Sequence, residues 1–196
     1  MSKNKSASGQ VRIISGQWRS RKLPIHDLEG LRPTTDRVRE TLFNWLSSDI
    51  SGARVLDCFA GSGALSLEAL SRYASYARIC ELQSNAAKQL KQNLVTLKCD
   101  NADVINGDSL VTLKQGLDST KEKGFDIVFV DPPFRKGLAN PTLALLAEKN
   151  WLNENALIYL ETESDITDLE IPADWVELKQ KSAGQVSYRL FQYQID

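Results

Sequence analysis

From Arg54 onward, the sequence alternates between short apolar runs and longer stretches with helical periodicity. The apolar runs predict strands at Arg54–Phe59, Ala77–Leu82, Asp103–Asn106, Phe125–Asp131 and Ala156–Glu161. The stretches between them predict helices at about 63–73, 84–98, 109–117 and 140–149. Trp175–Lys181 and Val186–Tyr193 predict a terminal antiparallel hairpin. Regular alternation of this kind indicates an α/β domain whose parallel strands are joined by right-handed crossovers.

The N-terminal part departs from this alternation. Val11–Ser15 and Arg21–Ile25 flank Gly16-Gln17-Trp18, which predicts a short β-hairpin. A helix is expected after it, capped by Thr34 or Thr35 and running to about Ile50. Residues 1–10 are polar and are expected to be disordered.

Charge is distributed unevenly along the chain. The net charge is −1, yet residues 1–26 carry six basic side chains and no acid, whereas residues 151–196 carry nine acids. The N-terminal end is therefore a candidate for holding a polyanion, with a solubilising tail as the alternative.

Composition excludes several classes of protein. No apolar run is long enough to span a membrane, and the N-terminus has no signal-peptide core, so a cytoplasmic location is expected. Three separate cysteines and one histidine supply neither a disulfide framework nor a zinc site, and no metal is expected. The histidine, His26, is interpreted as an exposed loop residue.

An acid stands at the carboxyl end of each of the first four strands of the alternating region, where ligands bind in doubly wound folds. These acids are Asp57, Glu81, Asp108 and Asp131. Each alone is equally compatible with a helix cap or a solvated loop charge. The first three together favour a cofactor that carries positive charge and hydrogen-bond donors.

The loop after the first of these strands contains Gly61-Ser62-Gly63 and opens a helix. A dinucleotide site would want a glycine or an alanine where this chain has Ser66, and the acid Asp57 would repel a pyrophosphate. S-adenosylmethionine carries an ammonium, a sulfonium and no phosphate, so an acid near the loop suits it. Glu81 is expected to accept the ribose hydroxyls, and Asp108 the adenine amino group. The predicted cofactor residues are Asp57, Phe59, Ala60, Gly61, Ser62, Gly63, Glu81, Leu82, Asp108 and Ser109.

The fourth strand ends in Asp131-Pro132-Pro133-Phe134, which combines an acceptor, a rigid turn and an aromatic ring. An exocyclic amine on a base is a poor nucleophile because its lone pair is delocalised. The Asp131 carboxylate and the Pro132 carbonyl are expected to accept hydrogen bonds from the two N–H groups of the amine. The two prolines are expected to fix the conformation of the loop. Phe134 is expected to stack on the base. A simple strand-ending turn is the alternative.

With these motifs in view, the chain resembles the RsmD family, bacterial methyltransferases that modify the N2 of one guanine in small-subunit (16S) ribosomal RNA. The resemblance covers nearly the whole chain from about Val11. It is carried by VRIISGQWRSRKL, LRPTTDRVRETLFNWL, LDCFAGSGALSLEALSR and DIVFVDPPF. The second stretch is the discriminating one, and Ser66 is a departure because the family usually has glycine there.

The resemblance implies a Rossmann-like class I S-adenosylmethionine-dependent methyltransferase fold, with a mostly parallel seven-stranded sheet. It implies an assembled or assembling small subunit as the substrate. The expected organisation is a tail at 1–10, a hairpin extension at 11–33 and a methyltransferase domain at 34–196, acting as a monomer.

Basic residues near the N-terminus are the candidates for RNA contact. The alternative for the basic residues between 32 and 39 is the solvated edge of a capped amphipathic helix. Trp18 is expected to pack in the hairpin rather than to stack on a base. The predicted RNA-contacting residues are Arg12, Arg19, Arg21, Lys22, Arg32 and Arg37.

Three other functions are weighed against this one. An adenine-N6 DNA methyltransferase would use the same acceptors, but no evident segment reads base edges. A nicotinamide dehydrogenase leaves the Asp-Pro-Pro-Phe loop unexplained. An RNA-binding assembly factor without activity would not need both loops intact.

Overall fold

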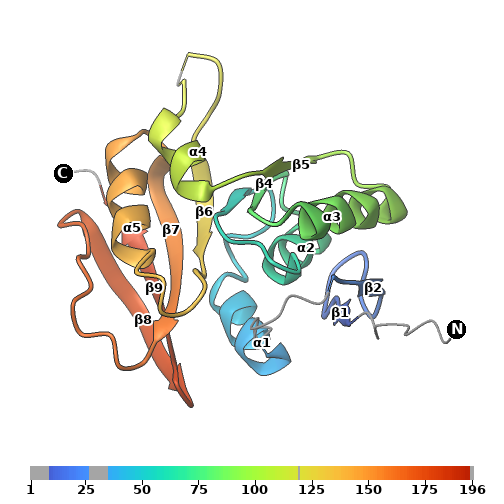
Figure 1. Ribbon diagram of the computed structural model, residues 1–196, viewed down its shortest axis with the longest axis horizontal. Coiled ribbons are helices and arrows are strands. Elements are labelled where there is room, and N and C mark those ends of the chain that lie inside the picture. Colours follow the sequence, from blue (N-terminus) through green and yellow to red (C-terminus); the bar gives the residue numbers. More distant parts are fainter. Residues whose placement is uncertain (1–8, 27–34, 119, 195–196) are drawn as a thin grey trace, which may run out of the picture.

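The computed structural model describes residues 9–26, 35–118 and 120–194. A seven-stranded sheet runs through the centre in the order β5-β4-β3-β6-β7-β9-β8 (Figure 1). Its first five strands are parallel, and β9 and β8 are antiparallel to their neighbours. The strands are β3 (Arg54–Asp57), β4 (Tyr76–Glu81), β5 (Ala102–Asn106), β6 (Phe125–Val130), β7 (Leu152–Glu163), β8 (Trp175–Ala183) and β9 (Val186–Tyr193).

Five helices among the described residues cover both faces of the sheet. One buried cluster joins α1, α2 and α3 to the sheet, and a second joins α4 and α5 to the opposite face. The predicted α/β fold class, with a mostly parallel seven-stranded sheet, is confirmed. The helices are α1 (Asp36–Trp45), α2 (Ala64–Ser71), α3 (Ser84–Leu97), α4 (Ser109–Gln115) and α5 (Ala139–Glu148).

Most predicted elements lie within one or two residues of their observed bounds. The strand β7 is an exception, because it begins at Leu152, which pairs with Phe125, rather than at Ala156. The helix α1 begins after Thr35, whose side chain accepts from the Val38 amide, and ends at Trp45, five residues before the predicted Ile50. No helix in the described ranges is long and apolar enough to cross a membrane.

The N-terminal hairpin is shorter than predicted. Its strands are β1 (Gln10–Arg12) and β2 (Lys22–Pro24), because the chain beyond Ile13 bonds to α2 instead of to the opposite strand. The amides of Ile14 and Ser15 donate to Glu68 over 2.7 and 3.0 Å. The predicted N-terminal tail lies almost entirely outside the described residues, and the predicted domain division stays a prediction.

Gly16 fits closely against the end of α2. It has φ +82°, and a Cβ at this position would collide with the Ser71 carbonyl. The Gln17 amide donates to that carbonyl over 2.8 Å, and the Trp18 amide donates to the Ser71 hydroxyl over 3.0 Å. The hairpin is therefore fixed on α2 by backbone contacts that leave its basic side chains at the surface.

We expect Glu68→Ala to lower the free energy of unfolding by about 3 kcal/mol. The Glu68 carboxylate has no exposed surface, and it also accepts from Arg72 Nε over 2.7 Å. Its removal leaves two amides and a guanidinium without their acceptor. Urea denaturation measures the change. The exposed Glu148, replaced by alanine, should stay within about 0.5 kcal/mol of the parent, and equal effects of the two substitutions would contradict this account.

Candidate active site

The loop after β3 is shaped by two glycines with positive φ, Gly61 at 53° and Gly63 at 75°. Gly63 is the N-cap of α2, and a Cβ there would collide with Leu90 of α3. Both positions thus favour glycine for geometric reasons, and at Gly63 the loop packs directly against the Leu90 side chain. Ser62 lies between the two glycines.

Asp57 lies beneath this loop. It is 1% exposed, and it accepts hydrogen bonds from the Ser66 hydroxyl and from the Phe59 amide. The pKa of Asp57 is raised to about 6, first by burial and also by the charge of Glu81, against the lowering effect of these hydrogen bonds. Ser66, which departs from the family pattern in the sequence, is fully buried and anchors this carboxylate.

Glu81, at the end of β4, ties two loops together. One carboxylate oxygen accepts from the Gly61 amide and the other from the Gln83 amide, each over 2.7 Å. It is 7% exposed, and burial raises its pKa against the effect of the two amides. Each oxygen accepts one described hydrogen bond, which leaves acceptor capacity at the loop.

The remaining predicted cofactor residues occupy different environments. Asp108 caps α4 by accepting a hydrogen bond from the Leu110 amide over 2.8 Å. A helix cap was the alternative to cofactor binding that the sequence left open for this acid. Ser109 is buried and donates to the Cys58 carbonyl. Phe59 and Ala60 are partly buried against the core, and Leu82 is 67% exposed.

The Asp131–Phe134 loop lies next to the glycine loop because β6 pairs with β3. Asp57 is opposite Phe129, and the Cys58 amide donates to the Phe129 carbonyl over 3.0 Å. Asp131 and Phe134 are half-buried, Pro132 is buried and Pro133 is exposed. Sequence position alone had suggested this proximity, and the strand register provides it.

The far end of this loop is held to β7. Arg135 has φ +59°, and its amide donates to the Glu163 carboxylate. The loop therefore leaves β6 and is fixed again on the neighbouring strand, which limits how far Asp131 can move.

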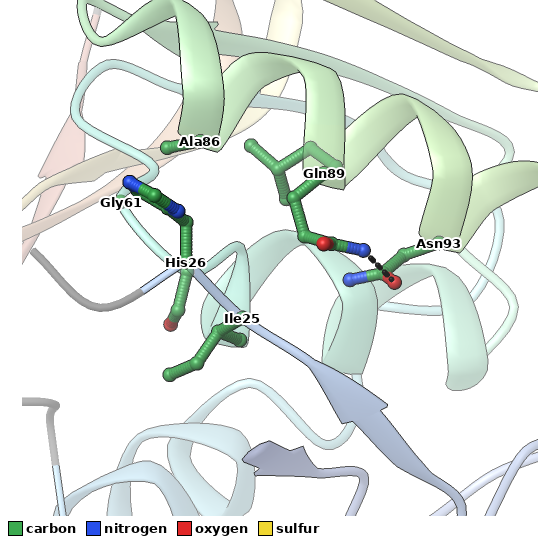
Figure 2. Close-up of a pocket in the computed structure, with 8 residues that line it drawn as sticks. Ile25, His26, Gly61, Ala86, Gln89 and Asn93 are labelled. Atoms are coloured by element: carbon green, nitrogen blue, oxygen red, sulfur yellow. Dashed lines mark hydrogen bonds between the residues drawn. The ribbon is translucent and has the colours of Figure 1, made fainter. Parts of the chain in front are cut away.

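The end of the hairpin reaches the glycine loop from the other side. Figure 2 shows His26 beside Gly61 and Ala86, with Ile25 just before it on the hairpin and Gln89 of α3 on the other side of the same site. The Asn93 side chain donates to the Pro24 carbonyl over 2.9 Å and fixes this approach. The space between these residues does not admit a water molecule, so they close against one another and do not form a ligand cavity. His26 is exposed, as predicted.

The predicted RNA-contacting residues fall into three groups. The side chains of Arg19, Arg21, Lys22 and Arg37 are exposed and make no ion pair within the described ranges. Arg12 instead pairs with Asp36 over 2.7 Å. Arg32 lies outside the described residues.

Arg39 of α1 and Trp18 of the hairpin have mainly structural roles. Arg39 is buried and holds both Asp36, over 2.6 Å, and the Arg12 carbonyl, over 3.0 Å. Trp18 is partly buried against the core, in agreement with the packing role expected for it.

Two further residues of this region, Ser66 and Glu68, were not predicted as site residues. Both belong to α2, all of whose residues are buried. The sequence signal for Glu68 was that it is the only acid in an otherwise apolar helix, because a buried carboxylate needs hydrogen-bond partners. What those partners are depends on tertiary packing.

Comparison with known proteins gives consistent matches over nearly the whole chain. The sequence model of a family described as conserved hypothetical protein 95 matches residues 11–192. The chain is 55% identical to the ribosomal RNA small subunit methyltransferase D of Escherichia coli strain K12, over 96% of this chain and 93% of the relative. The protein of that name from Haemophilus influenzae is 54% identical, over 95% and 96%. The solved structure of the putative methyltransferase yhhF from Escherichia coli has a TM-score of 0.86 at 54% identity, over 96% of this chain and 100% of that one.

We expect the pH dependence of stability to identify Asp57. Its pKa of about 6 in the folded protein exceeds the ordinary 3.8, so the stabilising proton is fully bound below pH 3.8 and its contribution is lost as the pH rises through about 6. The difference corresponds to about 3 kcal/mol. In Asp57→Asn, the loss of unfolding free energy between about pH 4 and 7 should be smaller by roughly this amount.

Urea denaturation at a series of pH values measures this effect. The exposed Asp100, replaced by asparagine, is the matched control and should reproduce the parent profile. Superimposable profiles for Asp57→Asn and the parent would show that the buried carboxylate does not titrate as described.

Proposed function

The chain belongs to the family described as conserved hypothetical protein 95, and on that premise we propose that it methylates the exocyclic N2 amine of a guanine in small-subunit ribosomal RNA. The membership agrees with the RsmD resemblance found in the sequence. The relatives named as ribosomal RNA small subunit methyltransferases support the class of substrate. The substrate we propose is the assembled or assembling small subunit.

The residues at the ends of β3 and β4 fit S-adenosylmethionine as the methyl donor. Asp57 and Glu81 place buried carboxylates beside the glycine loop, where the ligand's ammonium and hydroxyl donors find acceptors. When bound there, S-adenosylmethionine supplies a methyl group on a sulfonium, which leaves as a neutral thioether. Glu81, Asp108 and the Gly61–Gly63 backbone would hold it.

The observation that carries the proposal is the placement of Asp131 beside that loop through the pairing of β6 with β3. The Asp131 carboxylate and the Pro132 carbonyl each accept a hydrogen bond from one of the two N–H groups of the amine. This draws the nitrogen towards tetrahedral geometry and localises its lone pair for attack on the methyl carbon. The methylated nitrogen then gives up one proton, to Asp131 or to water. Pro132 and Pro133 fix the loop, and Phe134 stacks on the flipped base.

The hairpin is the proposed RNA-binding surface. It presents Arg19, Arg21 and Lys22 to solvent, while its backbone is fixed on α2. Exposed cations on a rigid support suit contacts to phosphates. Its end lies beside the glycine loop, so bound RNA would run towards the methyl donor.

Replacement of Asp131 by alanine should lower turnover at least 1,000-fold, because the amine loses one of its two acceptors in the transition state. Binding of S-adenosylmethionine should stay within about threefold of the parent. Labelled methyl transfer to small subunits measures the first quantity, and calorimetry the second. Asp100→Ala is the control on an exposed acid. Retained turnover in Asp131→Ala would remove Asp131 from the chemistry.

Reversal of charge at Arg21 should weaken binding to small subunits. It should also reduce the slope of the logarithm of the binding constant against the logarithm of the salt concentration by about one. The same reversal at Lys114, an exposed residue in the last turn of α4, should change neither. Filter binding across a salt series gives both quantities. An unchanged affinity of Arg21→Glu at low salt would count against the hairpin.

A further inference from the structure

The strand β7 brings a second carboxylate next to the Asp131 loop. Val130, the last residue of β6, pairs with Leu160 in the parallel register, so Asp131 leaves the sheet next to Glu161 of β7. Side chains alternate between the faces of a sheet, and Phe129 and Tyr159 belong to the core on the α1 side. Glu161 therefore projects towards that same side, as its hydrogen bond from Tyr159 shows, and the charge of Asp131 also acts on the Tyr159 phenol.

Glu161 is held there by a hydrogen bond from a neighbouring tyrosine. It is 6% exposed, and one carboxylate oxygen accepts from the Tyr159 hydroxyl over 2.6 Å. Within the described ranges, no group donates to its other oxygen. A carboxylate oxygen has two lone pairs, so this second oxygen can accept from a donor that arrives with a ligand.

The surroundings of Glu161 are aromatic. Tyr188 lies opposite it on β9, and the ring of Trp45 packs on Tyr188 with centroids 5.5 Å apart. The pKa of the Tyr159 phenol is raised well above its usual value, first by burial and then by the charges of Glu161 and Asp131, which places all three groups together. Hydrogen bonds to a carboxylate are strong in such an apolar setting.

We propose that Glu161 is a specificity-determining residue whose carboxylate accepts the N1–H of the guanine that Asp131 holds by its N2 amine. The inference rests on the proposed function and deepens it. Tyr159 acts through Glu161 as a positioning residue, because its hydroxyl fixes the orientation of the carboxylate.

The chemistry of the bases explains how this selects guanine. In guanine, the ring position beside the exocyclic amine is an N1–H donor, so two neighbouring carboxylates meet two adjacent donors. In adenine and in 2-aminopurine, the ring nitrogen beside the amine carries a lone pair, which a carboxylate repels. Glutamine at position 161 keeps the bond from Tyr159 through its carbonyl and turns an amide donor towards that nitrogen.

The test compares guanine with 2-aminopurine at the target position of reconstituted small subunits, after the methylated guanine has been located by mapping. The parent enzyme should favour guanine by about 10- to 100-fold in kcat/KM. In Glu161→Gln this ratio should fall at least tenfold. The fluorescence of 2-aminopurine, titrated with protein, gives a binding measurement that needs no turnover and should show tighter binding to the variant.

Three outcomes would overturn the inference while leaving the proposed function standing: an unchanged ratio, an equal loss on both bases, or unchanged binding of 2-aminopurine. Failure of the parent enzyme to methylate guanine would instead overturn the proposed function. Glu154→Gln, an exposed position on the same strand, is the control. If Glu161→Gln does not fold, Tyr159→Phe keeps the ring and should still reduce the preference for guanine several-fold.

Discussion

The pairing of β3 between β4 and β6 is the constraint on which the rest of the structure depends. In a parallel sheet, strands that are neighbours end at the same edge, so their following loops meet there. This places the glycine loop between the Glu81 turn and the Asp131 loop. The strand β9 pairs antiparallel with β7 on the side away from β6, and β8 pairs with β9, so both extend the sheet sideways and not across the ends of the parallel strands.

Buried carboxylates hold the loops at this edge. Glu81 accepts two loop amides, Asp57 accepts from Ser66 beneath the glycines, and Glu68 fixes the hairpin on α2. Each carboxylate is costly to bury, and each offsets that cost with hydrogen bonds. The result is a set of rigid loops with acidic groups on a protein whose net charge is only −1.

The sequence predicted most of the fold and part of the site, for identifiable reasons. Residues such as Leu90 and Leu94 repeat at the helical period, and the buried strands are short apolar runs, so these elements can be read locally. The glycine and Asp-Pro-Pro-Phe motifs mark their own loops. Glu161 could not be found in this way, because its importance lies in the register between β6 and β7. Ser66 was visible only as a departure from a pattern, since its partner Asp57 is nine residues away.

The central claim is that these two loops together methylate a guanine in the small ribosomal subunit. Transfer from labelled S-adenosylmethionine tests it directly, with three acceptors side by side: small subunits from cells lacking this enzyme, the naked RNA of those subunits, and double-stranded DNA. The account predicts label in the subunits, at the N2 of one guanine. Label only in DNA adenine would contradict it, although the arguments for the methyl donor and for Asp131 would stand.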